Sequence, residues 1–380
     1  MSCGEVREIE LSAWKIYVTR QRVVRRIGLG EGFNATQEDF IMATKSGPKL
    51  RILEVGRDPW IGPTYPADFL SLGRSISPGK FGHKPNLKHL PKIAWRILRR
   101  EYDVIALGPL QVDRTSGLSW RGRLVKRLIS RTAASPTLCW LMRQLLCGTR
   151  SSVVILDVSY TTWLSNAALK LFRPVVYFKR NLLKSDRVAS EWNLQVFPMA
   201  VEPYSAIPAA KTTDLFVCGA YTNDARMAAL AAARILQQLG WKVDIEEQTI
   251  AYEEYRARLA AARMVVCLQG YGFHTWRMYE AALARAVPVI DPPPENLIHD
   301  FVDGENCVVV QPSIAAIVKK LNHVLKSPRT MEAVAERAFQ GAEQKHTLVA
   351  CSSILVSEIE KATQDRSFES RSFLRRVASS

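Results

Sequence analysis

The sequence of 380 residues contains no run of eighteen or more apolar residues, so we expect no membrane-spanning helix. It also contains no C-x-x-C pair, and its seven cysteines are scattered and odd in number. Neither a zinc site nor a disulfide framework is therefore predicted. The N-terminus lacks a continuous apolar core and carries Glu5, Glu8 and Glu10, which argues against a secretory signal peptide. We expect a cytoplasmic protein.

Positive charge dominates the composition. The chain has 52 lysine and arginine residues against 36 aspartate and glutamate residues, a formal net charge of +16. Such an excess is typical of proteins that bind an anionic partner, such as a phosphorylated substrate, an acidic lipid surface or nucleic acid. No recognisable nucleic-acid-binding module accompanies the charge, so nucleic acid is the least favoured of the three.

One basic stretch, within residues 121–131, has the spacing of an amphipathic helix. Basic residues alternate there with large aliphatic ones: Arg121, Arg123, Leu124, Lys126, Arg127, Leu128, Ile129 and Arg131. A solvated charged face and a contact with an anionic membrane surface are both compatible with this pattern. The second alternative would place the protein peripherally at a membrane.

Length and patterning predict two α/β domains, because a chain of this size is too long for one ordinary core. Short apolar runs alternate with helical segments at the spacing of β-α-β crossovers, which indicates parallel, doubly wound sheets. Prolines interrupt this alternation between 197 and 213. The predicted division is an N-terminal extension at 1–49, a first α/β domain at 50–203, a linker at 204–213, a second α/β domain at 214–345, a helix at 346–364 and a disordered basic tail at 365–380.

The expected elements follow from the same periodicity. Strands are predicted at 50–55, 103–107, 152–158, 174–178, 214–218, 241–245, 264–268, 287–290 and 307–310. Helices are predicted at 87–100, 119–146, 162–172, 223–239, 252–262, 275–286, 294–302, 314–325 and 331–361.

Ligands of open parallel sheets gather outside the carboxyl ends of the strands. The segment after the predicted strand 214–218 contains Gly219, which allows close backbone approach, and Thr222 and Asn223, either of which can cap the next helix. Arg226 lies one turn into that helix and can add a cation to a phosphate site at its N-terminus. An ordinary capped helix has the same pattern, so both interpretations stay open.

A longer motif follows the predicted strand 264–268. Residues 269–291 read QGYGFHTWRMYEAALARAVPVID. This stretch resembles the nucleotide-binding region of GT-B glycosyltransferases, notably the CgeB-like (spore maturation protein type) and exostosin-like groups related to glycosyltransferase family 4. Their R-x-x-E-A-x-x-A-G-x-x-P-V-I-like pattern is matched by Arg277, Glu280, Ala281, Ala284, Pro288, Val289 and Ile290. The resemblance implies that Glu280 accepts hydrogen bonds from the ribose hydroxyls of the donor and that Arg277 faces its diphosphate.

The chain departs from family 4 at three points. Family 4 usually has a second glutamate eight positions before the one that matches Glu280, and this chain has Gly272 there. Arg285 replaces the usual glycine, and the glutamate lies one residue further from Pro288 than in family 4. A weaker resemblance to the CgeB-like group extends to residues 177–180.

The resemblance implies an α/β, GT-B-like fold with two Rossmann-like domains that face a cleft. The second domain would bind a nucleotide-sugar donor and the first a glycan, lipid or protein acceptor. Arg226, Arg277 and a helix N-terminus would stabilise the departing diphosphate, so neither a metal nor a cofactor is expected. The expected activity is transfer of a hexosyl or related glycosyl group, with a retaining outcome by analogy with family 4.

Several further residues lie where a catalytic or binding group is expected. Asp157, Lys179 and Arg180 are at or near predicted strand ends of the first domain, and each is either catalytic or structural. His274 either contacts the sugar or diphosphate or only lies beside the start of its helix. Asp291 could meet the base or the sugar, but an aspartate before a proline-rich turn is ordinary local chemistry, and this interpretation is favoured.

Two other functions are compatible with the sequence. One is a different enzyme of the same fold, either an inverting transferase or a nucleotide-sugar epimerase. The other is a non-catalytic protein that binds the nucleotide but has lost transfer, which the missing acid at Gly272 would explain.

Overall fold

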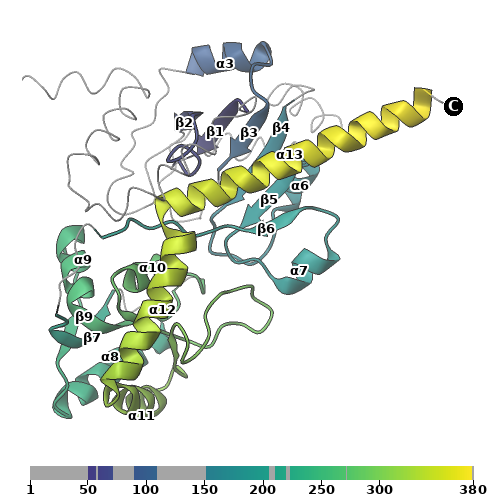
Figure 1. Ribbon diagram of the computed structural model, residues 1–380. Coiled ribbons are helices and arrows are strands. Elements are labelled where there is room, and N and C mark those ends of the chain that lie inside the picture. Colours follow the sequence, from purple (N-terminus) through teal and green to yellow (C-terminus); the bar gives the residue numbers. More distant parts are fainter. Residues whose placement is uncertain are drawn as a thin grey trace, which may run out of the picture. The chain divides into compact units, whose positions relative to one another are not determined.

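The structure, a computed structural model, describes seven stretches of the chain (Figure 1): 50–56, 59–71, 90–108, 151–204, 210–219, 223–270 and 272–378. The predicted extension 1–49, the predicted helix 119–146 and its basic stretch 121–131 lie outside these residues. Within them, every helix is too short or too polar to span a bilayer.

The first sheet consists of parallel strands in the order β2-β1-β3-β4-β5-β6. Their bounds are β1 (Ile52–Gly56), β2 (Ala67–Ser71), β3 (Val104–Leu107), β4 (Ser152–Asp157), β5 (Val176–Lys179) and β6 (Leu194–Val196). The four strands predicted here are present, and β2 and β6 are additional. Because the strands are parallel, all their carboxyl ends lie at one edge of the sheet.

Both faces of the first sheet are covered. Along β4, Val153 and Ile155 pack on one face, and Val154 and Leu156 pack on the other, as the two-residue period of a strand requires. The covering helices are α3 (Leu90–Leu98) and α6 (Asn166–Phe172) on the first face and α13 (Leu348–Ala378) on the second. A short helix, α7 (Lys184–Ala189), follows β5.

The second sheet is also parallel, with the strand order β11-β10-β9-β7-β8. Its strands are β7 (Thr213–Cys218), β8 (Val243–Glu246), β9 (Ala262–Val266), β10 (Val287–Ile290) and β11 (Val308–Val309). The chain runs outward in one direction from β7 to β8 and in the other from β9 to β11. The topological switch point therefore lies between β7 and β9, where doubly wound sheets bind ligands.

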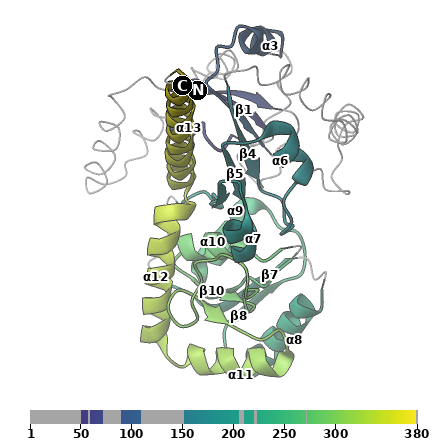
Figure 2. The same cartoon turned by 90° about the vertical axis from the view of Figure 1, so that its right-hand side faces the viewer.

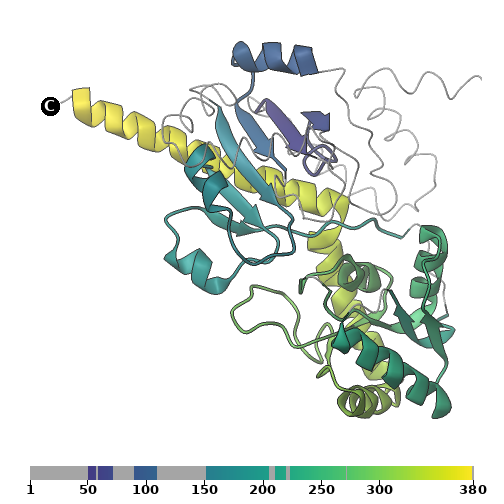
Figure 3. The same cartoon turned by 180° about the vertical axis from the view of Figure 1, so that it is seen from behind.

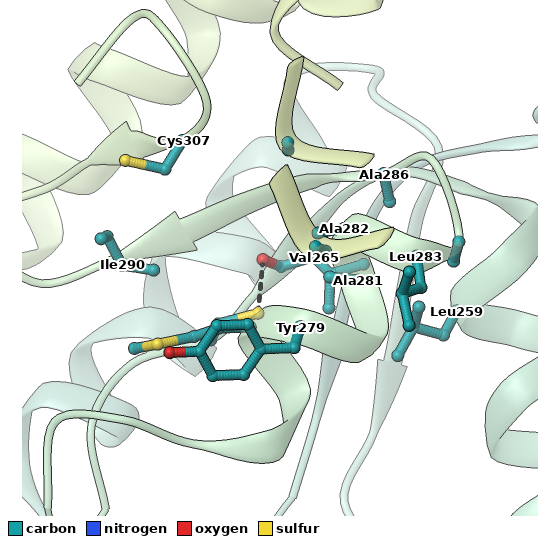
Figure 4. Close-up of a cluster of buried hydrophobic side chains, with 14 of the residues drawn as sticks. Leu259, Val265, Tyr279, Ala281, Ala282, Leu283, Ala286, Ile290 and Cys307 are labelled. Atoms are coloured by element: carbon teal, nitrogen blue, oxygen red, sulfur yellow. Dashed lines mark hydrogen bonds between the residues drawn. The ribbon is translucent and has the colours of Figure 1, made fainter. Parts of the chain in front are cut away.

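Helices cover both faces of the second sheet as well. They are α8 (Asp224–Gln238), α9 (Tyr252–Ala261), α10 (Trp276–Leu283), α11 (Ile314–Leu325) and α12 (Pro328–His346). Helices α8 and α11 lie side by side on one face (Figure 3), and α10 and α12 lie side by side on the other (Figure 2). Small side chains, among them Ala281, Ala282 and Ala286, bring the α10 segment close to the strands (Figure 4). This close packing holds the N-terminus of α10 at the carboxyl edge of the sheet.

Two helix predictions are corrected by the structure. Residues 294–302 are not helical, because the backbone there pairs with the segment after β5: Leu183 and Leu297 form an antiparallel bridge, and Lys184 N–H donates to Asn296 O at 2.7 Å. The single predicted helix 331–361 is two helices, α12 and α13. They are separated at Thr347, whose extended backbone (ψ 157°) bridges to Val201.

The described part of the chain is thus α/β with two parallel sheets, as expected. Helix α13 continues through 365–378, where we expected disorder; this stretch has neither glycine nor proline to end a helix. The predicted boundaries of the two α/β domains and of the linker stay predictions.

Candidate active site

The start of α8 is tied to the segment that follows β9. Asn223 is the N-cap residue of α8, and its Oδ1 accepts a hydrogen bond from Arg226 N–H at 3.0 Å. Its Nδ2 donates to Gln269 O at 3.1 Å. One side chain therefore caps the helix after β7 and links it to the residues after β9, on the two sides of the topological switch point.

Two arginines cross this switch point. Arg277, from the helix after β9, lies against Gly219 at the end of β7, where an added Cβ would be 2.6 Å from the arginine Nη2. Arg226, from the helix after β7, lies against Gly270 beyond β9, where an added Cβ would be 2.7 Å from its Nη2. Any side chain at either glycine would displace a guanidinium group. Gly219 also has a φ of +123°, which L-residues rarely adopt.

The beginning of α10 retains unused polar groups. Thr275 is the N-cap residue, but its side chain makes no capping bond, and its Oγ1 is buried without a hydrogen-bond partner among the described residues. The Nε of Arg277, in the first turn, is likewise buried and unpartnered within the same part of the chain. Buried donors without partners are uncommon, and a helix N-terminus beside an arginine is suited to an anion.

Glu280 lies one helical turn after Arg277, and its side chain is buried. Its Oε1 accepts a hydrogen bond from Tyr252 at 3.2 Å, and its Oε2 accepts one from Tyr255 at 2.8 Å. Burial raises the pKa of this carboxyl group, although both tyrosine hydroxyls stabilise its charge. A carboxylate has about four acceptor positions, so Glu280 can accept further hydrogen bonds.

Gly272, where the resemblance to family 4 would place an additional glutamate, has no room for a side chain. A Cβ at this position would lie 2.6 Å from Tyr160 O and 2.8 Å from Asn181 Nδ2. Asn181 Nδ2 itself donates to Tyr160 O at 2.7 Å. The space is thus filled by residues that follow β4 and β5 of the first sheet.

Asp157 and Lys179 end the neighbouring strands β4 and β5 and form a buried ion pair. Lys179 Nζ lies 2.9 Å from Asp157 Oδ2, and its side chain has no exposed surface. It also donates to Ser159 Oγ at 2.7 Å, while Tyr177 donates to Asp157 Oδ2 at 2.7 Å. Burial is the main reason that the pKa of Lys179 is lowered. Both charged groups are thus satisfied by protein atoms.

Arg180 joins the strand ends of the first sheet to the N-terminus of α10. Its guanidinium carbon lies 4.3 Å from the ring centre of Tyr160 and 4.8 Å from that of Trp276, and its Nη2 donates to His274 O. Its Nη1 donates to Val158 O at 3.4 Å. The side chain is almost wholly buried, and burial lowers the pKa of Arg180.

His274 is buried, and both of its ring nitrogens are hydrogen-bonded to protein groups. Nε2 lies 3.2 Å from Ile298 O, and a carbonyl can only accept, so Nε2 carries the proton. Nδ1 then accepts from the Tyr279 hydroxyl at 2.8 Å. Burial lowers the pKa of His274 to about 4. In this arrangement the imidazole is neutral and orients Tyr279.

His346 also packs against Tyr279, with ring centres 3.9 Å apart, and burial lowers its pKa to about 4 as well. Between pH 6.5 and pH 4 the unfolded chain binds protons at both histidines that the folded chain does not bind. The free energy of unfolding should therefore decrease as the pH is lowered from 7 to 5, by about 2 kcal/mol for each histidine. Urea unfolding at pH 7 and pH 5 measures this loss.

The variants His274→Gln and His346→Gln should each remove the contribution of one histidine, or about half of the loss of stability between pH 7 and pH 5. His323→Gln, which removes an exposed imidazole from α11, is the matched control. An equal loss of stability between pH 7 and pH 5 in the wild type and in both buried-site variants would contradict the assignment.

The structure places the sequence-predicted residues in two groups. Gly219, Asn223, Arg226 and Arg277 converge on the switch point, with Glu280 one turn behind. Asp157, Lys179 and Arg180 lie at the strand ends of the first sheet, where Lys179 pairs with Asp157 and Arg180 donates to the backbone of His274.

Sequence reasoning missed Gly270, Tyr252, Tyr255, Tyr160 and Asn181. The strand-end glycines of Q-G-Y-G could have indicated Gly270, whereas the other four depend on contacts between distant segments. In the described ranges, no three His, Cys, Asp or Glu side chains gather in a metal-binding arrangement.

A known family model matches the part of the chain that forms the second sheet and its helices. Residues 206–353 match the family model described as "Glycosyl transferase-like", and this match contains every residue of the switch-point group. A search of curated proteins finds no significant match.

Solved structures resemble the chain over most of its length. A glycosyltransferase from Rickettsia africae has a TM-score of 0.51 and 10% identity, with 83% of this chain and 99% of that chain covered. Sucrose-phosphate synthase from Thermosynechococcus elongatus (TM-score 0.48, 10% identity, 82% and 98% covered) is also similar. So is Anabaena HepE in complex with UDP and glucose (TM-score 0.47, 11% identity, 82% and 100% covered). The fold is α/β and GT-B-like, and the chain carries a glycosyl transferase-like domain.

Proposed function

We propose that this protein transfers a sugar from a nucleotide-sugar donor to an acceptor and that the donor diphosphate binds at the switch point between β7 and β9. The observation that carries the proposal is the crossed pair of arginines, Arg226 and Arg277, each set against a glycine at the end of the opposite strand. Two guanidinium groups beside two helix N-termini suit a diphosphate, which carries several negative charges.

The same pair accounts for the chemistry of transfer. Negative charge accumulates on the diphosphate as the bond to the sugar breaks, and cations already in place stabilise that charge without reorganisation. The buried Nε of Arg277 and Oγ1 of Thr275, which have no hydrogen-bond partner in the described part of the chain, add donors to this site. The proposal needs neither a metal nor a cofactor, because the arginines supply the positive charge.

The proposed acceptor is a glycan, a lipid or a protein that approaches from the side of the first sheet. The net charge of +16 favours acceptors or surfaces that carry negative charge, including an anionic membrane. We propose that the residues on the acceptor side of the site are Asp157, Lys179 and Arg180. The contacts of Arg180 with Trp276 and His274 O support a role in positioning the N-terminus of α10.

A panel of nucleotide sugars tests the proposal. A bound donor stabilises the folded state, by about 2.7 kcal/mol at a concentration one hundred times its Kd, so thermal shift should identify one nucleotide and one sugar. Release of nucleoside diphosphate from that donor, measured with and without candidate acceptors, then separates a transferase from a protein that only binds. If no member of the panel stabilises the protein, the proposal is wrong.

Glu280→Gln should weaken binding of the donor by about tenfold or more, or on the order of 1.5–3 kcal/mol. We propose that Glu280 accepts hydrogen bonds from two ribose hydroxyls, and glutamine keeps the shape but loses the charge. Isothermal titration with the ribonucleotide and with its 2′-deoxy analogue measures the effect, which should be smaller for the analogue. Glu253→Gln, an exposed change on the neighbouring helix α9, is the control.

A further inference from the structure

Asp291 follows β10 at the same carboxyl edge as the arginine pair, and only 2% of its surface is exposed. Its Oδ1 accepts a hydrogen bond from Gln269 N–H at 2.8 Å. Its Oδ2 is buried and has no hydrogen-bond partner in the part of the chain that the structure describes. Among the described residues, one oxygen of this carboxylate therefore has a hydrogen-bond partner and the other has none.

The unused oxygen is unfavourable in the folded protein taken alone. A buried acceptor without a donor loses the hydrogen bonds that water gave it, and for a charged group this loss is larger. Burial accordingly raises the pKa of Asp291. The bond from Gln269 N–H, at the end of the neighbouring strand, accounts for Oδ1, but it leaves Oδ2 unexplained. A donor group of a ligand would explain it.

The position of Asp291 indicates which part of a ligand it meets. Strands β7, β9 and β10 are neighbours in the sheet, and their ends carry, in this order, Gly219 with Arg277, Gly270 with Arg226, and Asp291. Gln269, the partner of Asp291, directly precedes Gly270, and the charge of Arg226 acts on Asp291. Asp291 thus lies next to Arg226, on the side away from Arg277. Glu280 lies toward β7 as well, because its partner Tyr255 packs against Phe216 of that strand.

A nucleotide sugar has hydroxyl groups on both sides of its diphosphate. If the ribose lies toward Glu280, the group beyond the other phosphate is the sugar that is transferred. This chain has no side chain at Gly272, where family 4 has an acid, and the space there is filled by Tyr160 O and Asn181 Nδ2. At the same strand ends, Asp291 Oδ2 is an acceptor that none of the described residues uses.

We propose that Asp291 Oδ2 accepts a hydrogen bond from a hydroxyl group of the transferred sugar and so contributes to the choice of sugar. This inference rests on the proposed function, because it places the diphosphate at Arg226 and Arg277. Asp291 is then a binding and specificity-determining residue for the sugar, with no role in binding the nucleoside.

Asp291→Asn is the decisive variant, because asparagine can still accept from Gln269 N–H while the position of Oδ2 becomes an amide that only donates. Kd values for the nucleoside diphosphate and for the nucleotide sugar selected from the panel are measured by calorimetry. We expect the first to change by less than about twofold and the second to rise about tenfold or more. Asp365→Asn removes an exposed charge from α13 and is the matched control.

Deoxy analogues of the same nucleotide sugar identify the hydroxyl. For the wild type, one analogue should bind about tenfold more weakly than the parent nucleotide sugar. For Asp291→Asn, that analogue and the parent should bind with equal affinity. Circular dichroism of each variant verifies that it is folded. If Asp291→Asn is not folded, it is replaced by Asp291→Ser, whose hydroxyl is a smaller acceptor.

The outcomes separate this inference from the function on which it rests. If Asp291→Asn weakens the diphosphate and the nucleotide sugar equally, or weakens neither, the inference is wrong and the proposed function stands. If the wild-type protein binds no nucleotide sugar in the panel, the proposed function is wrong, and this inference is overturned with it.

Discussion

Arg277→Ala is expected to lower kcat for sugar transfer by about 10²-fold or more, because it removes a fixed cation from the place where the leaving diphosphate gains charge. The guanidinium group lies against Gly219, and its buried Nε has no hydrogen-bond partner among the described residues. The affinity for the donor should fall less than kcat does, because the charge is greatest in the transition state.

Steady-state kinetics with the donor identified by the panel measures the two effects separately. Arg234→Ala is the matched control: it removes an arginine from the far end of α8, where the side chain is 58% exposed and paired with Glu247. Loss of a surface ion pair of this kind costs at most about 1 kcal/mol of stability, and transfer should be unchanged. Equal kcat values for wild type and Arg277→Ala would contradict the role of Arg277.

Lys179→Met is expected to lower the free energy of unfolding by about 3–5 kcal/mol, because it leaves the Asp157 carboxylate buried without its counter-charge. The ion pair is 2.9 Å long, and the two side chains are 0% and 4% exposed. Asp157→Asn combined with Lys179→Met removes both charges, so the double variant should be more stable than Lys179→Met alone. Urea unfolding of the wild type and of the two variants gives the values.

The control is an ion pair of the same length at the surface. Lys320 and Asp303 are also 2.9 Å apart, but their side chains are 40% and 44% exposed. Lys320→Met should cost less than about 1 kcal/mol, since water compensates the remaining charge. A catalytic rather than structural Lys179 would give a different result, in which Lys179→Met is as stable as Lys320→Met but transfers no sugar.

Much of the fold could be predicted because its signals are local. Strand 287–290 and helix 314–325 have the predicted bounds, since an apolar run between turn residues and a 3.6-residue period are complete within each segment. Strand β2 was missed because its sequence, ADFLS, is short and follows a loop rich in glycine and proline. Segment 294–302 was predicted as a helix and is not one, because its backbone pairs with residues after β5, more than a hundred positions away.

The candidate site divides in the same way. Arg226, Arg277 and Glu280 could be selected from the sequence, because each lies near the start of a helix that follows a strand. The contact of Arg277 with Gly219 could not be predicted, because it joins helix α10 to the end of β7, and only the strand order brings these two segments together. The tyrosine partners of Glu280 and the unused oxygen of Asp291 depend on tertiary packing in the same manner.

The sequence by itself therefore determined the α/β class, the elements around the motif and the candidate charged residues, because periodicity and strand-end position are properties of short segments. Tertiary structure alone decided which of those charges are neutralised. Lys179 is paired within the core, whereas Arg277 and Asp291 each keep a buried polar atom unpartnered among the described residues. The reason is physical: burial and hydrogen bonding depend on every segment that packs around a group, and here those segments are separated by tens to hundreds of residues along the chain.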